Sequence, residues 1–262
     1  GSGSGRPRME TQSEFFFCSG AATEVLKVGS SQSGLDPVLT VMCACGPDGA
    51  AAARRDVFGL DGQIQHKLAF IRDRVPRGTR LVLVGHSIGC YMILEMMRRS
   101  PELEVLKAVL LFPTIERMAQ SPQGKVMTPM LCQLRYLAYL PLFLLSLLPQ
   151  RVATLLVRLV LLLALMVLVL VAVNSMYLGG QEMRMVQERD NVTIQKYLDR
   201  LIFYYGATDH WCPVSYFQDM RRDFPHGDIR LCERGIRHAF VLDAGQEVAQ
   251  MVAAWIGGSL SA

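Results

Sequence analysis

Charge is in short supply in this sequence, and no strong excess of one sign is present. Only 19% of the 262 residues are charged, and the formal net charge is +4. Lys and Arg are scattered instead of forming the dense basic stripe with which proteins bind a phosphate backbone. We therefore expect no nucleic-acid partner. The chain also has no internal repeat, and since one α/β domain can run to roughly 250 residues, we expect a single domain.

Metal-binding patterns are missing as well. The seven cysteines are odd in number, and several stand in apolar runs, which is typical of buried thiols in a reducing compartment. Cys43 and Cys45 are separated by one residue, but no second Cys or His pair at ligand spacing accompanies them. We interpret them as buried strand cysteines, and we expect neither a metal ion nor an organic cofactor.

A secretory signal is also lacking. Residues 10–13 are polar, and the FFFC run that follows them is too short for the apolar part of such a signal. We therefore expect synthesis in the cytosol, so that the Asn191 sequon is a coincidence, because glycosylation takes place on the lumenal side. Residues 1–8 resemble a Gly/Ser linker, so Met9 is the expected natural start of a domain at 9–262.

Short apolar runs alternate with helical stretches along most of the chain. This alternation is typical of a mostly parallel sheet covered by helices, and it predicts an α/β fold. The apolar runs predict strands at residues 14–18, 23–28, 38–45, 80–84, 106–112, 201–205 and 228–232. Apolar residues at helical spacing predict helices at residues 61–74, 88–99, 215–223 and 246–256.

The middle of the chain is almost entirely apolar. Residues 159–173 (LVLLLALMVLVLVAV) contain no polar side chain, although a bilayer span usually takes about 20 apolar residues. A shorter apolar block precedes this run. We favour a hairpin at residues 131–176 that enters one lipid leaflet, with Arg151 and Arg158 reaching back to the head groups. A buried helix in an apolar cap and a full transmembrane span are the alternatives.

A nucleophile motif follows the predicted strand at residues 80–84. Residues 85–89 read GHSIG, the G-x-S-x-G pattern that places a serine on a sharp turn between a strand and a helix. The two glycines permit the tight turn that exposes the hydroxyl of Ser87. The backbone N–H of Ile88, at the start of the predicted helix, is the expected oxyanion donor. The residues alone assign no second donor.

A serine nucleophile needs a base, and the base needs an acid to orient it. In this fold they follow in the chain order Ser, acid, His. Asp209 follows an apolar strand, and His238 lies between the last predicted strand and helix, so we expect Ser87, Asp209 and His238 to form a triad. An ordinary turn aspartate and a structural histidine are the alternatives. The remaining histidines fit less well: His66 falls within a helix, His86 is expected to face away from Ser87, and His210 and His226 lie in loops.

Several long stretches resemble the lipid-droplet-associated hydrolase family of serine hydrolases. They cover most of the chain from Gly59 onward, and a weaker match lies near FCSGAATEVLKVG. The stretches are GLDGQIQHKLAF (59–70), LVLVGHSIG (81–89), LLFPTIERM (110–118), YLGGQEM (177–183), FYYGATDHWCP (203–213), DFPHGDIRLCE (223–233) and HAF (238–240).

The resemblance implies an α/β-hydrolase of lipid esters, such as sterol esters or other neutral lipids, with a role in lipid and cholesterol homeostasis. It implies a location on lipid droplets and on the cytosolic face of the endoplasmic reticulum, so the expected partners are a lipid ester substrate and a droplet monolayer or that membrane. It carries the triad over as Ser87, Asp209 and His238, and it supports the hairpin interpretation of the apolar middle.

The chain departs from the family after the predicted strand at 38–45. The family has a Pro-Gly-Asn-Pro-Gly loop there, which supplies the other oxyanion donor, followed by a helix and a strand. Here only GPDGAAAARRD (46–56) intervenes, so one β/α unit is missing. Residues 14–28 should therefore detach from the main sheet or pair differently to bury its edge. Removing one oxyanion donor typically slows such enzymes about 100- to 1,000-fold.

Three functions are compatible with these features. The first is hydrolysis of lipid esters by Ser87, His238 and Asp209, with the apolar segment bringing the enzyme to its insoluble substrate. The second is a catalytically weak or inactive protein of the same fold that acts at a lipid-droplet surface. The third is an acyltransferase that uses the same triad, which would need an acyl acceptor that outcompetes water.

Overall fold

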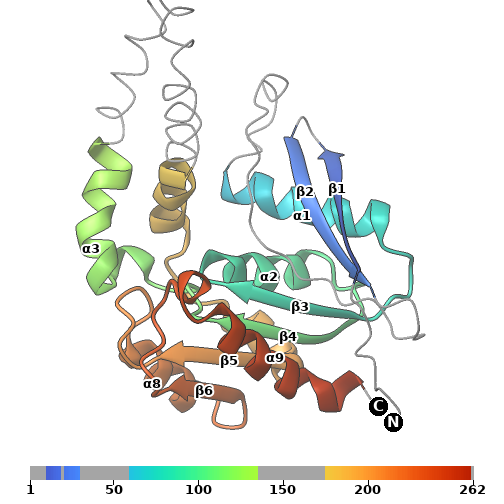
Figure 1. The fold of residues 1–262 in the computed structure, drawn as a ribbon. Helices are drawn as coiled ribbons and strands as arrows, with labels where there is room; N and C mark the ends of the chain where they lie inside the picture. The colour runs from blue at the N-terminus through green and yellow to red at the C-terminus, as the bar shows by residue number, and fades with distance from the viewer. Residues whose placement is uncertain (1–9, 19–20, 30–58, 135–174, 261–262) are drawn as a thin grey trace, which may run out of the picture.

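A computed structural model describes residues 10–18, 21–29, 59–134 and 175–260. A sheet of four parallel strands forms the centre of this part of the chain, and its strands lie in chain order (Figure 1). The strands are β3 (Leu81–His86), β4 (Val105–Leu111), β5 (Leu201–Gly206) and β6 (Asp228–Cys232). Because the strands are parallel, their carboxyl ends meet at one edge, where loops from distant parts of the sequence come together.

The middle of the sheet is buried because β5 and the end of β4 are apolar on both faces. All six residues of β5 (LIFYYG) are buried, and so are the last four residues of β4. Such continuous apolar runs, without alternation of polar and apolar residues, are typical of parallel strands that helices cover on both faces. The predicted strands at 80–84, 106–112, 201–205 and 228–232 are therefore confirmed, with ends that differ by one or two residues.

Helices cover this sheet. The helix α1 packs on α2, α2 packs on β3 and β4, and α8 packs on β5 and β6, while α9 packs against β4 and crosses in front of the strands in Figure 1. Their bounds confirm the predicted helices: α1 is Leu60–Arg74, α2 is Ile88–Arg99, α8 is Val214–Asp223 and α9 is Gly245–Leu260. The α/β fold predicted from the sequence is thus the observed one.

Several short helices are present that apolar spacing did not predict. They are better signalled by their caps: Ser121 accepts a hydrogen bond from Gly124 N at the start of α3, and Asp190 accepts one from Thr193 N at the start of α7. Residues 175–185 are also helical. The other short elements are α3 (Pro122–Pro129), α7 (Asn191–Lys196), η1 (Met118–Gln120), η3 (Leu198–Arg200), η4 (Phe240–Leu242) and a π-helix, η2 (Met130–Leu134).

The N-terminal hairpin forms a sheet of its own. The strand β1 (Glu10–Cys18) pairs antiparallel with β2 (Ala21–Gly29), and among the described residues neither strand pairs with β3. The detachment expected of residues 14–28 concerns their pairing beside the strand predicted at 38–45, so it stays a prediction. The predicted strand at 38–45 and the segment GPDGAAAARRD lie outside the described residues, so the missing β/α unit stays a prediction.

The described residues on the two sides of the apolar middle lie side by side. Cys132 donates its thiol hydrogen to Gly180 O (3.6 Å), and Arg184 donates to Cys132 O (3.4 Å). Gln181 of the same helix accepts a hydrogen bond from Leu60 N (2.5 Å), which joins it to the start of α1. The apolar segment itself, residues 135–174, lies outside the described residues, and with it the hairpin, cap and span interpretations. Within the described ranges, no helix has the length and apolar character needed to cross a bilayer.

Candidate active site

Ser87 occupies the sharp turn between β3 and α2. Its φ of 54° and ψ of −124° lie in a region that non-glycine residues rarely adopt, and such strain is concentrated at functional sites. The turn is possible because Gly85 and Gly89 approach closely: a Cβ on Gly85 would lie 2.9 Å from the Gly89 carbonyl carbon and 2.7 Å from Ile93 Cδ1. The G-x-S-x-G spacing therefore has the steric reason that the sequence predicted.

His238 contacts Ser87 although it lies 151 residues further along the chain. It lies in the loop between β6 and η4, and its Nε2 is 2.8 Å from Ser87 Oγ. Its Nδ1 is 2.6 Å from Asp209 Oδ2. Asp209 comes from the loop after β5, so the structure brings together all three residues that the sequence singled out. Both distances are within hydrogen-bond range.

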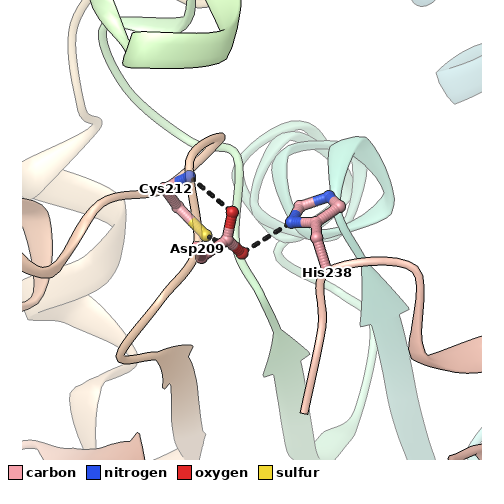
Figure 2. Close-up of side chains that lie close together, drawn as sticks. All are labelled: Asp209, Cys212 and His238. Atoms are coloured by element: carbon pink, nitrogen blue, oxygen red, sulfur yellow. Dashed lines mark hydrogen bonds and ion pairs between the residues drawn. The ribbon is translucent and has the colours of Figure 1, made fainter. Parts of the chain in front are cut away.

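Asp209 is a buried carboxylate whose two oxygens both accept hydrogen bonds. Oδ1 accepts from Trp211 N (2.7 Å). Figure 2 shows the contacts with the other two residues: Oδ1 also accepts from Cys212 N (3.3 Å), while Oδ2 accepts from His238 Nδ1 and from the Cys212 thiol (3.0 Å). Burial by itself would raise the pKa of Asp209, but the hydrogen bonds and the charge of His238 outweigh it and hold that pKa below its ordinary value. Asp209 is therefore ionised over the range in which imidazole titrates.

These contacts fix which imidazole nitrogen carries the proton. An ionised carboxylate can only accept, so His238 Nδ1–H donates to Asp209. His238 Nε2 is then the acceptor for the hydroxyl hydrogen of Ser87. The arrangement can remove that proton as a carbonyl carbon is attacked, and it can deliver the proton to a leaving group afterwards.

His86 contacts the main chain of His238. Its Nε2 is 2.7 Å from the His238 carbonyl oxygen, and the two imidazole rings lie 5.2 Å apart between centroids. This hydrogen bond holds the main chain of His238, a role of His86 that the sequence did not indicate. Burial, followed by the charge of His238, lowers the pKa of His86, so the ring is neutral and Nε2–H is the donor.

The ring of Phe112 packs against the aromatic rings of the site. Directly after β4 it adopts a φ of 49°, and its fully buried ring lies 5.9 Å from the His238 ring and 5.5 Å from the Phe240 ring. A Cβ on Gly206 would lie 2.7 Å from that ring, so β5 can end there only in a glycine. The stretch LLFPTIERM (110–118) did not indicate that Phe112 packs beside His238, since a positive φ at a phenylalanine cannot be predicted from the sequence.

Comparison with known proteins gives a consistent result. A family model described as lipid-droplet associated hydrolase matches residues 38–241. A chicken protein named lipid droplet-associated hydrolase is 53% identical over 79% of this chain and 67% of its own length. The chain belongs to the lipid-droplet-associated hydrolase family. The human protein of that name is 48% identical over 82% of this chain and 69% of its own length, and the fruit fly protein is 34% identical over 77% and 70%.

Solved structures share the fold of this member of the lipid-droplet-associated hydrolase family. A bacterial membrane phospholipase A matches with a TM-score of 0.62 at 16% identity, covering 96% of this chain and 87% of the other. A haloalkane dehalogenase from Bradyrhizobium elkani matches with a TM-score of 0.63 at 11% identity, covering 96% and 99%. At these identities the similarity concerns the fold, which confirms the α/β-hydrolase fold expected from the sequence.

The expected oxyanion donor has a suitable position in this hydrolase. Ile88 is the first residue of α2, so its N–H belongs to the four N-terminal amides that have no acceptor within the helix. It also directly follows the nucleophile, as an oxyanion donor in this fold does. Residues 46–49, where a second donor would be sought, lie outside the described residues.

A metal ion would have one group of side chains to bind within the described part of this hydrolase. Asp209, Cys212 and His238 offer ligand atoms that lie within 4.8 Å of one another. Hydrogen bonds already occupy these atoms, however, and burial together with the charge of Asp209 raises the pKa of Cys212 well above its ordinary value, so the thiol keeps its proton. A cysteine can bind a metal ion only as a thiolate. The arrangement therefore favours acid–base chemistry. Cys43 and Cys45, interpreted above as buried strand cysteines, lie outside the described residues.

Proposed function

We propose that this chain is a serine hydrolase of lipid esters, with Ser87 as nucleophile, His238 as general base and Asp209 as the acid that orients it. The observation that carries the proposal is the continuous chain of hydrogen bonds from Ser87 Oγ to His238 Nε2 (2.8 Å) and from His238 Nδ1 to Asp209 Oδ2 (2.6 Å). A solvent-exposed serine without a base is a poor nucleophile, and this chain of contacts is what activates it.

The reaction follows from the positions of the protons. His238 takes the hydroxyl hydrogen as Ser87 Oγ attacks the ester carbonyl, and the N–H of Ile88 donates to the oxyanion that forms. His238 then gives the proton to the departing alcohol, which leaves an acyl group on Ser87. Water attacks this acyl-enzyme with His238 again as base, and the free acid leaves.

The family supports a lipid as the substrate. Its named members are lipid droplet-associated hydrolases, and we propose sterol esters or related neutral lipids as substrates, with a role in lipid and cholesterol homeostasis. The proposed location is the droplet surface and the cytosolic face of the endoplasmic reticulum. The apolar run at 159–173 suits this location, because it would hold the enzyme against the lipid surface that contains its water-insoluble ester substrate.

A second function is favoured by one feature of the sequence. Only 11 residues, GPDGAAAARRD (46–56), replace the family's Pro-Gly-Asn-Pro-Gly loop and the unit after it. Without a second oxyanion donor, catalysis would be about 100- to 1,000-fold slower. The chain would then be a lipid-droplet surface protein with a weak or inactive site.

A serine-directed fluorophosphonate probe separates the two functions. We expect the native chain to be labelled and the Ser87→Ala variant, checked for folding by circular dichroism, to remain unlabelled. A cholesteryl ester emulsion and a triacylglycerol emulsion should then release fatty acid in proportion to the labelled fraction. A folded native chain that takes up no probe would leave the surface-protein function in place of the hydrolase.

A further inference from the structure

A buried thiol contacts the acid of the proposed triad, and the mechanism above makes no use of it. Cys212 is 0% exposed, and its Sγ lies 3.0 Å from Asp209 Oδ2. This is the oxygen to which His238 Nδ1 donates at 2.6 Å, and Figure 2 shows the thiol and the imidazole approaching the carboxylate from different sides. Two donors thus share one oxygen, one from an imidazole and one from a thiol.

The thiol can act here only as a donor. Burial and the negative charge of Asp209 raise the pKa of Cys212 well above its ordinary value, so sulfur keeps its hydrogen. An ionised carboxylate has no hydrogen to give, so the S–H must point to Oδ2. The main chain holds the thiol in place, because Cys212 N donates to the other carboxylate oxygen at 3.3 Å.

We infer that Cys212 is a positioning residue of the site: its S–H shares Asp209 Oδ2 with His238 and so limits how strongly the carboxylate holds the imidazole proton. A carboxylate that receives a further hydrogen bond carries less negative charge at the shared oxygen and stabilises an imidazolium less. Removing the thiol should therefore strengthen the hold of Asp209 on the imidazole proton. The inference rests on the proposed function, since it concerns the same three side chains.

Other titratable groups around these side chains do not provide the same effect. Tyr205 of β5 and Tyr216 of α8 interact electrostatically with Cys212, but burial raises the pKa of both, so they are uncharged at neutral pH. Cys90 of α2 also contributes electrostatically to the raised pKa of Cys212, and its contribution is smaller than that of Asp209. His86 of β3 faces His238, but its lowered pKa leaves it neutral as well. Asp209 is therefore the charge that the thiol meets.

Cys90 offers a matched control. It is also 0% exposed, and its thiol donates to a main-chain carbonyl, Leu111 O, at 3.4 Å. Cys90→Ala and Cys212→Ala remove the same atoms from the core, but only the second removes a donor from Asp209. A loss of stability common to both variants measures core packing. A change in proton affinity at His238 that only the second variant shows measures the contact with the acid.

The test measures the pH dependence of kcat/KM for p-nitrophenyl butyrate in the full chain and in C212A, C212S and C90A. We expect the acid-side midpoint to move upward by about 0.5 pH unit in C212A, which corresponds to about a threefold change in proton affinity. C212S, whose hydroxyl is again a donor, should restore the native midpoint, and C90A should leave it unchanged. An unchanged midpoint in C212A, an equal shift in C90A, or no restoration by C212S overturns the inference.

A second readout needs no turnover. In protein labelled with ¹⁵N-histidine, the titration midpoint of the His238 ring should move upward in C212A and return in C212S. The Nδ1–H proton resonance should move downfield in C212A, since its bond to Asp209 strengthens. If the native chain shows no Ser87-dependent hydrolysis, the proposed function fails, and these spectra still decide the inference. If hydrolysis depends on Ser87 and the spectra of C212A match the native ones, the inference alone fails.

Discussion

Two carboxylates stand at the carboxyl ends of adjacent strands and have different partners. Asp209 follows β5 and contacts the imidazole of His238, whereas Glu116 follows β4 and contacts two guanidinium groups. Arg189 Nη1 lies 3.2 Å from Glu116 Oε1, and Arg117 Nη2 lies 2.8 Å from Glu116 Oε2. Both carboxylates are buried.

The difference lies in what the partner can do with its proton. Arginine stays charged at all pH values that a folded protein meets, so the Glu116 group is a fixed ion-pair network. It extends through Arg117 to Asp219 (2.6 Å) and through Arg189 to Asp223, and so ties the loop after β4 to α8. Imidazole gains and loses a proton near neutrality. The same acid group therefore supports structure at one strand end and chemistry at the next.

Removing the charge of Asp209 should have the largest effect. Asp209→Asn keeps the shape of the side chain but offers His238 Nδ1 no carboxylate, so the imidazole loses the tautomer that accepts from Ser87. We expect kcat to fall about 10⁴-fold. Steady-state kinetics on a soluble ester would measure this. A loss below about tenfold in a folded variant would mean that Asp209 does not have the role proposed.

The matching change at the other carboxylate should affect stability instead. Glu116→Gln leaves the buried Arg189 side chain, 6% exposed, with Asp223 as its remaining acidic partner. Breaking one side of a buried pair should cost about 3 kcal/mol, and we expect the melting temperature to fall by about 6–12 °C. Calorimetry measures the fall, and kcat per folded molecule should stay near the native value. A large loss of kcat without a loss of stability would remove the distinction between the two sites.

His86 should have a smaller effect on catalysis. His86→Phe keeps an aromatic ring against Phe112 and Phe240, but it removes the N–H that donates to the His238 carbonyl. The loop that carries His238 should then be held less firmly, and we expect kcat to fall about tenfold with KM unchanged, as for loss of one hydrogen bond. Initial rates over a range of substrate concentrations separate the two constants. A rise in KM alone would assign His86 to substrate binding.

The same residue should produce the smallest effect, a change in the pH dependence of stability. The pKa of His86 is lowered from 6.5 on folding, so below pH 6.5 the unfolded chain binds the proton that the folded chain does not. The unfolding free energy of the native chain should therefore fall as the pH drops below this value. His86→Phe should show a shallower fall over the same range in urea titrations. An identical slope in both proteins would mean that His86 is not neutral in the fold.

The parts of the site that follow from chain order could be predicted from the sequence. Ser87, Asp209 and His238 each come after a predicted strand, and parallel strands bring their carboxyl ends to one edge, so motif and order were sufficient to bring them together. The fold class followed in the same way from the alternation of apolar runs and helices.

The contacts that depend on side-chain direction could not be predicted. Whether Cys212 turns toward Asp209 is decided within a short turn, and no residue pattern fixes that rotamer. His86 faces the site because the main chain of the His238 loop passes over it, 152 residues along the sequence. Glu116 and Arg189 are 73 residues apart and belong to no recognisable motif. The start of α3 has a sequence signal, because Ser121 is a favourable N-cap and Pro122 a favourable first helical residue. Apolar spacing did not predict so short a helix.

The central claim is that Ser87 carries the acyl group during turnover. The most direct test is to mix the full chain with p-nitrophenyl butyrate, quench in acid within the first turnover, and locate the added mass by peptide mass spectrometry. The account predicts a butyryl group on the peptide that contains Ser87 in the native chain and none in Ser87→Ala. Turnover with no acyl group on that peptide, or with the group on another residue, would contradict it.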